Sequence, residues 1–188
     1  MSRVPPKWPP VEVETPERHP DAPEPGTKLG PHYDFCFGCG DALEGGLHLH
    51  TEADAGQIVR AQFTVTDQHQ GAPGLAHGGL LACAFDEALG STVGHLLRRP
   101  AVTGKLETDF LRPVPVGSTL HIVSRLDGIA GRKVYASAEG HLDAPDGPVA
   151  LRARALFVIV DFSHFTEHGT ADPRDVQPGA DRRFDINP

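Results

Sequence analysis

One stretch constrains the fold of this chain more than any other. Residues 77–97, HGGLLACAFDEALGSTVGHLL, are apolar on nearly every helical face and are long enough for about five helical turns. A helix on a protein surface carries a polar stripe, so this one is predicted to be buried on most sides. Arg98 and Arg99 suit the negative end of the helix dipole, and Pro100 stops the helix. The rest of the fold must therefore cover this helix.

Six segments around the helix have the character of strands. In residues 58–65, for example, apolar side chains at every second position alternate with polar ones. The four strands after the helix are joined by turns and are predicted to pair as an antiparallel meander. The combination predicts an α+β domain, a curved antiparallel sheet of about six strands wrapped around one long central helix. The predicted strands are residues 46–51, 58–65, 102–112, 119–127, 133–143 and 149–160.

The chain length of 188 residues suits one folded domain, which we place at residues 32–162. Residues 1–31 hold nine of the 18 prolines and no sustained periodicity, which predicts an extended or disordered arm. Trp8 is the exception, because a lone tryptophan in such an arm can dock onto the folded body. Residues 163–188 are polar and are predicted to form a C-terminal tail.

Charge and composition exclude several classes of protein. The net charge of −8 argues against a nucleic-acid partner, and no apolar run approaches the ~20 residues that span a membrane. Three cysteines, an odd number, do not suggest a disulfide framework and favour a reducing compartment. We therefore expect a cytoplasmic protein without nucleic-acid or membrane partners.

Two glycines open the predicted helix and could expose backbone donors to a ligand. The first N–H groups of a helix have no partner within it. Because Gly78 and Gly79 have no Cβ, a substrate carbonyl can approach these groups, and the helix dipole favours negative charge there. They are candidates for an oxyanion hole. The structural alternative is that they only permit a tight turn into the helix.

Asp86 and Glu87 are the only carboxylates in this apolar helix. Burying an ionised carboxylate is costly unless it is paired or hydrogen-bonded, so their presence needs a reason. We expect one of them to face the interior or a cleft as a functional group. The alternative is that Asp86 bonds a buried backbone group while Glu87 is solvated.

The spacing of these groups bears on the assembly. Gly78 and Asp86 are eight residues apart, or about 12 Å along a helix. A carboxylate and an oxyanion donor that act on one carbonyl must lie within about 3 Å of the reacting atoms. One helix cannot supply both, but two antiparallel copies can. If the segment is catalytic, we expect at least a dimer with two symmetric sites.

The run HGGLLACAFDEALG, followed by VTGKLETDFLRPVPVG and preceded by CFGCG, resembles the PaaI-like branch of the hotdog-fold thioesterases. The resemblance covers about residues 36–161. It implies a hotdog fold and the hydrolysis of acyl-CoA thioesters by a homodimer or a dimer of dimers. It implies no cofactor apart from the CoA of the substrate.

The resemblance also implies roles for four residues. Asp86 falls on the family's catalytic carboxylate, a general base or a nucleophile, and Gly78 on an oxyanion donor from the opposite subunit. His77 matches a histidine at the helix start that orients the thioester carbonyl or holds the loop. Thr103 matches a strand threonine that lies beside the catalytic water in some members.

Further residues are expected to bind substrate. Gln70 lies near an amide side chain of some members, and Asp109 stands where some relatives have a substrate-contacting amide. CoA carries phosphates, so cations near the mouth of the site are candidates to bind them, the alternative for each being a solvated surface charge. The residues expected to bind substrate, of which the last three are these cations, are Gly79, Gln70, Asp109, Phe110, Arg112, Arg132 and Lys133.

The pair Cys36 and Cys39 has the C-x-x-C spacing of zinc and redox sites. A zinc site typically has a second spaced pair of ligands, whereas only scattered histidines are present, and a redox motif would open a helix after a strand. We therefore expect a structural loop and no metal. Cys83, in the apolar helix, is predicted to be a small core residue.

Two other functions are compatible with the same fold. One is a non-catalytic acyl-CoA-binding sensor, although the proline-rich arm shows no helical periodicity or basic stripe for DNA binding. The other is a hydratase or dehydratase, which the resemblance disfavours because those relatives place their acid on a loop before the helix.

Overall fold

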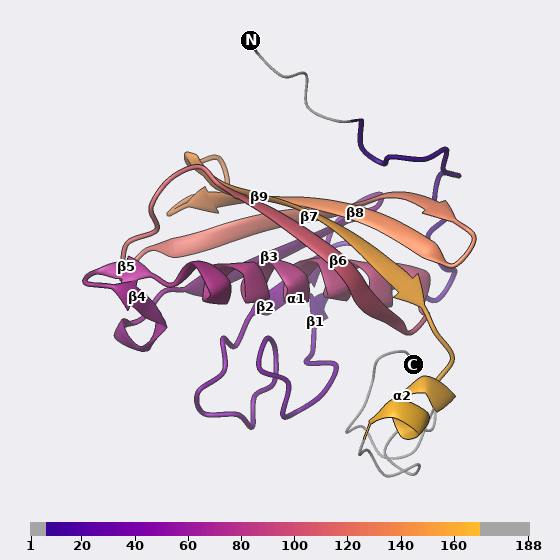
Figure 1. Cartoon of the computed structure of the whole chain (residues 1–188), viewed down its shortest axis with the longest axis horizontal. Coiled ribbons are helices and arrows are strands. Elements are labelled where there is room, and N and C mark those ends of the chain that lie inside the picture. Colours follow the sequence, from indigo (N-terminus) through magenta and orange to yellow (C-terminus); the bar gives the residue numbers. More distant parts are fainter. Residues whose placement is uncertain (1–6, 170–188) are drawn as a thin grey trace.

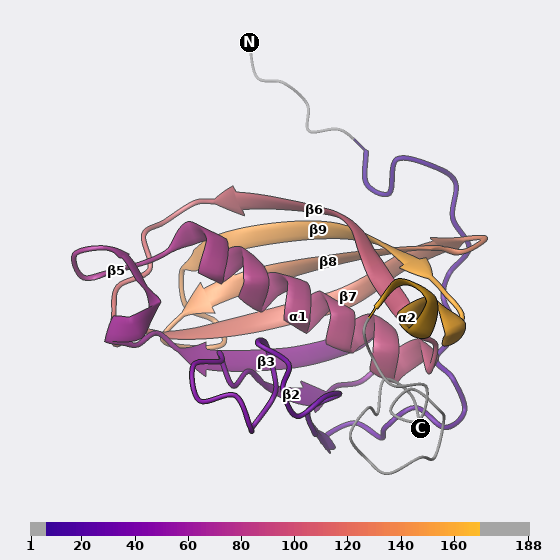
Figure 2. The same ribbon diagram turned by 60° about the horizontal axis from the view of Figure 1, so that its bottom comes forward.

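The computed structural model describes residues 7–169. Helix α1 (Gly78–Leu97) lies along one face of a curved seven-stranded antiparallel sheet (Figures 1 and 2). The strand order is β1–β2–β3–β7–β8–β9–β6. Their bounds are β1 (Lys28–Leu29), β2 (His50–Ala53), β3 (Ile58–Thr64), β6 (Ala101–Phe110), β7 (Thr119–Ala130), β8 (Lys133–Leu142) and β9 (Val149–Ile159). A small hairpin of β4 (Gln70–Ala72) and β5 (Leu75–Ala76) precedes α1, and a short helix α2 (Ser163–His168) follows β9.

Helix α1 is buried on most sides, as its sequence predicts. The side chains of Phe85, Leu89 and Leu96 are fully buried in the core between helix and sheet. The helix ends where expected, because Arg98 adopts a left-handed conformation with a φ of 54° and donates its N–H to the Gly94 carbonyl. Apolar burial therefore fixes the helix against the concave face of the sheet.

Two buried hydroxyls also connect α1 to the sheet. Thr92 of α1 and Ser124 of β7 are fully buried and hydrogen-bonded to each other. Thr92 Oγ1 donates to the Ala88 carbonyl at 2.8 Å, and Ser124 Oγ donates to the Val59 carbonyl of β3 at 3.0 Å. Because a buried polar group is costly unless it is satisfied, this pairing specifies how the helix sits on the sheet.

The pairing of the strands after the helix differs from the prediction in one place. Strands β7, β8 and β9 form the expected meander, but β6 pairs with β9 at the edge of the sheet, and β7 pairs with β3. The turns inside the meander are short and force neighbours together. The link from β6 to β7, residues 111–118, is long enough to cross the ~14 Å occupied by three strand spacings.

The first predicted strand is also displaced. The prediction placed it at residues 46–51, whereas β2 covers His50–Ala53. Leu47 and Leu49 are both 4% exposed, although they precede the strand. Their alternation arises because a loop packs onto the core, and sequence periodicity does not distinguish such a loop from a strand.

The described part of the N-terminal arm, residues 7–27, lies extended against the domain (Figure 1). Trp8 Nε1 donates to Asp127 Oδ2 at 2.8 Å, and the indole ring packs edge-on against Tyr135. Arg18 donates to the Asp54 carbonyl at 2.8 Å. Of the predicted tail, residues 170–188 lie outside the described residues. Within residues 7–169 no helix is long and apolar enough to cross a membrane.

Candidate functional site

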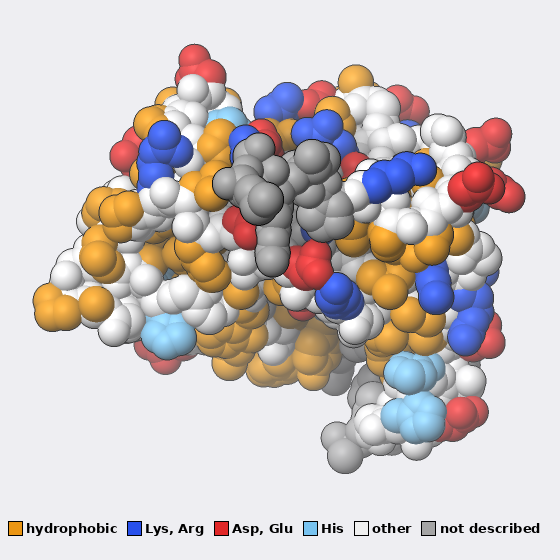
Figure 3. All heavy atoms as spheres, turned by 45° about the horizontal axis from the view of Figure 1, so that its top comes forward, with side chains coloured by type: hydrophobic (Ala, Val, Ile, Leu, Met, Phe, Trp, Pro, Cys, Tyr) orange, Lys and Arg blue, Asp and Glu red, His pale blue; other side chains and the backbone are white. Residues whose placement is uncertain are grey.

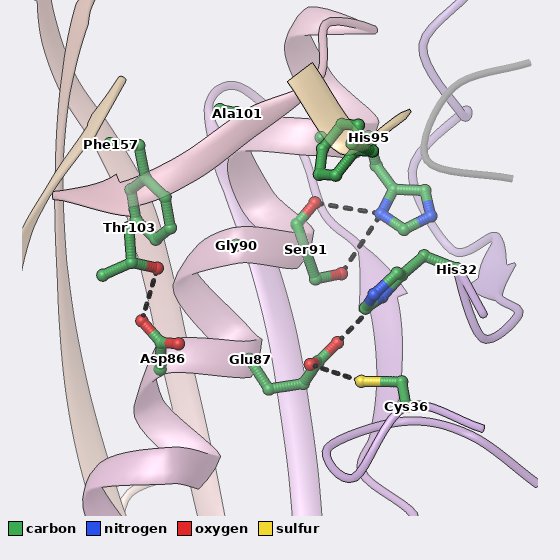
Figure 4. Close-up of a pocket in the computed structure, with 12 residues that line it drawn as sticks. His32, Cys36, Asp86, Glu87, Gly90, Ser91, His95, Ala101, Thr103 and Phe157 are labelled. Atoms are coloured by element: carbon green, nitrogen blue, oxygen red, sulfur yellow. Dashed lines mark hydrogen bonds and ion pairs between the residues drawn. The ribbon is translucent and has the colours of Figure 1, made fainter. Parts of the chain in front are cut away.

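Asp86 projects from α1 into a pocket of about 270 Å³ beside the start of β6 (Figure 4). The Thr103 hydroxyl of β6 donates a hydrogen bond to Asp86 Oδ1 at 2.9 Å. Phe157 of β9 and Phe165 of α2 contribute apolar walls, and Gly90 lies one helical turn beyond Asp86. The structure thus brings together two of the predicted catalytic residues, a carboxylate and a hydroxyl, at the edge of a cavity.

The surroundings of Asp86 alter its proton affinity. Burial raises the pKa of Asp86 above its ordinary value, and the nearby charge of Glu87 acts in the same direction. The hydrogen bond from Thr103 favours the ionised form and opposes part of this effect. A carboxylate with an increased proton affinity beside a cavity is suited to accept a proton from a bound water.

The neighbouring carboxylate points the other way (Figure 4). Glu87 Oε2 lies 3.3 Å from Cys36 Sγ, and Glu87 Oε1 lies 3.3 Å from His32 Nδ1. Its side chain is only 11% exposed. The alternative in which Glu87 is solvated is therefore wrong, because the loop that carries Cys36 covers this side of the helix.

The two glycines at the start of α1 have different surroundings. The Gly79 N–H donates to His77 Nδ1 at 3.0 Å, so the His77 side chain caps the helix. The Gly78 N–H precedes the first intrahelical hydrogen bond, and the helix itself supplies no acceptor for it. The Phe110 ring covers this turn, since a Cβ on Gly78 would lie 3.6 Å from it. Gly78 is thus the better candidate for a donor to a ligand.

Gln70 and Asp109 do not share the pocket with Asp86. The Gln70 amide is used within its own loop, where Nε2 donates to the Asp67 carbonyl at 3.0 Å and Oε1 accepts from the Gly74 N–H at 2.7 Å. Asp109 lines a separate groove of about 620 Å³ that also includes the indole of the N-terminal arm. Within one copy of the chain, neither side chain reaches the carboxylate on α1.

The predicted cations fall into two groups. Arg112 lines a shallow pocket with Gly78 and donates to the Val149 carbonyl. Arg132 lies in the turn between β7 and β8, and Lys133 begins β8, roughly 30 Å from Arg112 along the sheet. Figure 3 shows that basic and acidic side chains are interspersed on the outer face of the sheet, the face that points away from α1. Only Arg112 lies at the glycine end of the helix.

Several residues of the pocket were not predicted from the sequence, although the spacing of some of them along the helix indicated a shared face. Glu87, Ser91 and His95 recur every fourth residue and so share one face of α1. Ser91 Oγ lies 3.2 Å from His95 Nδ1. This stripe is half-buried rather than solvated, because the loop of residues 30–49 and helix α2 pack beside it (Figure 2). The pocket residues to which the sequence had assigned no role include Ser91, His95, Phe157 and Phe165.

Comparison with known proteins gives a consistent result. Residues 73–147 match the profile of the thioesterase superfamily. Acyl-coenzyme A thioesterase THEM4 of Bos taurus is 46% identical over 92 residues, which are 49% of this chain and 37% of the bovine protein. PA0474 of Pseudomonas aeruginosa, named as an esterase candidate, is 32% identical over 90 residues, which are 47% of this chain and 67% of that protein.

Among solved structures, the Escherichia coli PaaI protein superposes with a TM-score of 0.58 at 21% identity, covering 64% of this chain and 86% of that chain. At this identity the likeness concerns the fold, and it confirms the hotdog architecture predicted from the sequence. The match to THEM4 spans little more than a third of the bovine relative.

Proposed function

Because the chain belongs to the thioesterase superfamily, we propose that it hydrolyses the thioester bond of an acyl- or aryl-coenzyme A to the free acid and CoA. The observation that carries this proposal is the Asp86–Thr103 hydrogen bond at the edge of a pocket of about 270 Å³. The name of the bovine relative, an acyl-coenzyme A thioesterase, supports CoA esters as the substrate class.

In the proposed reaction, Asp86 takes a proton from a water molecule, and the water oxygen attacks the thioester carbon. The tetrahedral intermediate collapses by breaking the C–S bond, and the proton passes to the departing CoA sulfur. A thiolate is a good leaving group, so a positioned base, a water and a backbone donor suffice without a further cofactor. A single turnover in heavy-oxygen water tests for direct attack, because an acyl anhydride of Asp86 that water opens at the aspartyl carbonyl leaves the label in the Asp86 carboxylate.

A second copy of the chain would complete the site. Strand β6 forms one edge of the sheet, with no partner on its outer side among residues 7–169. At its end, Phe110 and Leu111 are 52% and 46% exposed, which is unusual for large apolar side chains outside an interface. A two-fold pairing at this edge would set the two α1 helices antiparallel and bring Gly78 of one copy towards Asp86 of the other.

The same arrangement favours Arg112 as the residue that binds a phosphate of CoA. Arg112 lies at the Gly78 end of α1, so a two-fold axis that brings Gly78 to the opposite Asp86 also brings Arg112 there. Its planar guanidinium is well suited to phosphate. Arg132 and Lys133 lie at the opposite end of the sheet from Arg112, level with the start of β6, because Lys133 and Val102 both pair with Val158 of β9.

The decisive experiment measures thiol release from short, medium, long and aromatic acyl-CoAs with the wild-type chain and Asp86→Asn. We expect the variant to lose at least about 100-fold in turnover while it still binds substrate. Asp146→Asn, in the exposed turn between β8 and β9, is the matched control and should retain full activity. Full activity of Asp86→Asn would remove that residue from the reaction. Binding without turnover by the wild-type chain would favour a sensor.

The shared site has its own test. Gly78 is the first residue of α1, and the extended conformation of His77 before it, with a ψ of 128°, tolerates a following proline. Gly78→Pro therefore removes the N–H donor with little strain. Mixing Gly78→Pro chains with Asp86→Asn chains should restore one working site in each heterodimer. A verified heterodimer that stays inactive would contradict the shared-site arrangement.

A further inference from the structure

A compact cluster of ligand-type side chains lies beside α1 on the side that Glu87 faces, next to the pocket of Asp86. It consists of His32, Cys36 and Cys39 from the loop before β2 and Glu87 from the helix. Figure 4 shows three of these side chains, those of His32, Cys36 and Glu87. One potential ligand atom from each residue lies within 4.8 Å of all the others. All four side chains are partly or fully buried. The cluster therefore joins two segments that are 48 residues apart in the sequence, counted from Cys39 to Glu87.

The distances in this cluster agree with a tetrahedral metal centre. Cys39 Sγ lies 3.1 Å from His32 Nδ1, and Glu87 lies 3.3 Å from both Cys36 Sγ and His32 Nδ1. With zinc bonds of about 2.0–2.3 Å to nitrogen, oxygen and sulfur, the ligands of a tetrahedral site lie about 3.3–3.8 Å apart. These three separations are within a few tenths of an ångström of that range and no pair exceeds 4.8 Å, so movements of about 1 Å or less close the side chains around an ion.

The charge of the cluster also favours a cation. Two cysteines and a glutamate are potential anions, and a single imidazole cannot neutralise all three. Buried groups of like charge are costly unless they are compensated, and a divalent cation would compensate them.

The backbone of the loop is shaped to hold the sulfurs. The Gly38 N–H donates to Cys36 Sγ at 3.3 Å, which is an interaction that stabilises a thiolate. Gly38 packs so closely on Glu87 that a Cβ at this position would overlap the carboxylate. A Cβ on Gly40 would likewise lie 2.6 Å from the Cys36 nitrogen. Both glycines of the CFGCG segment thus permit the turn that brings the two cysteines to the helix.

We propose that His32, Cys36, Cys39 and Glu87 form a structural zinc site that fastens the loop of residues 30–49 to helix α1. Four protein ligands leave no open position, so the ion is structural rather than catalytic. The site adjoins the Asp86 pocket, because His32, Cys36 and Glu87 also line its wall. Zinc would therefore hold this wall in place while Asp86, one residue before a ligand, faces the cavity. This proposal differs from the metal-free loop expected from the sequence, and the metal content of the protein decides between the two.

The test uses the full chain, purified under reducing conditions without chelators, with its metal content determined by elemental mass spectrometry. We expect about one zinc per chain. Cys36→Ser, Cys39→Ser and His32→Ala should each lower zinc affinity at least about tenfold. Cys83→Ser is the matched control, because Cys83 is the third cysteine, lies outside the cluster and should leave the zinc content unchanged.

A second measurement does not depend on how well the ligand variants fold. Wild-type apoprotein titrated with Co²⁺ should develop a thiolate-to-cobalt charge-transfer band and the intense visible bands of a tetrahedral site. Reduced wild-type chain that takes up neither zinc nor cobalt would overturn the proposal. So would metal that binds equally well to Cys36→Ser, or a Cys36–Cys39 disulfide that re-forms in preference to binding metal. These readouts need no turnover, so they are independent of the proposed hydrolase activity.

Discussion

The buried hydroxyl pair between α1 and β7 offers a quantitative test of what holds the helix in place. Thr92→Val keeps the shape of the side chain but removes a hydroxyl that is hydrogen-bonded to Ser124 and to the Ala88 carbonyl. Both side chains are fully buried, so water cannot replace the lost partner. Ser124 retains the carbonyls of Val59 and Ala88 as acceptors, which limits the damage. We expect the free energy of unfolding to fall by about 1–3 kcal/mol.

The chain contains a matched control for this substitution. Thr64 and Thr119 form a second hydroxyl pair between β3 and β7, with the two oxygens 3.0 Å apart, but this pair is exposed. Thr64→Val makes the same chemical change in water and should alter stability by less than about 0.5 kcal/mol. Urea unfolding followed by far-ultraviolet circular dichroism measures both. At about 2 kcal/mol per molar urea, the Thr92→Val midpoint should fall by about 0.5–1.5 M.

A double-mutant cycle completes the test. If the two hydroxyls act as one unit, Ser124→Ala combined with Thr92→Val should cost less than the sum of the single changes by at least about 0.5 kcal/mol. Equal midpoints for Thr92→Val and Thr64→Val would refute the argument, because burial would then have no influence on the cost of losing the hydroxyl.

Three further predictions concern other parts of the molecule. Gly140→Ala should destabilise the fold, because a Cβ there would lie 2.7 Å from Cζ of the buried Phe85. By contrast, a Cβ on Gly90 in α1 would make only an ordinary 3.7 Å contact, so Gly90→Ala should raise the free energy of unfolding by about 0.5–1 kcal/mol in the same urea assay. Asp127→Ala removes the acceptor of the Trp8 indole, and the emission of this single tryptophan should shift to longer wavelength; an unchanged spectrum would mean that the ring packing on Tyr135 alone holds the arm. Phe110→Glu places a charge at the exposed end of β6 and should shift the sedimentation coefficient to that of a smaller species, whereas an unchanged coefficient would argue against assembly through this edge.

The sequence by itself determined the parts of this protein that depend on local pattern. An apolar helix without a solvated face has to be covered, and the alternation in residues 58–65 reappears as alternating burial along β3. The same segment contained the carboxylate and the glycines, and their spacing along one helix already required a second copy for a shared site. Local order along the chain was sufficient for these inferences, because helix period, strand period and rise per residue are properties of the backbone.

The tertiary structure decided what depends on contacts between distant segments. Nothing in the turn after β6 indicates that this strand joins β9 rather than β7, since a loop of that length permits either pairing. Likewise Glu87 is indistinguishable from a solvated acid until the loop with Cys36 and His32 packs against it. The cluster forms only because the loop of residues 30–49 packs against helix α1. The spacing of residues along the sequence does not show that these two segments come into contact. Pairing partners and side-chain clusters are properties of the packed chain, whereas the elements that carry them are already readable in the sequence.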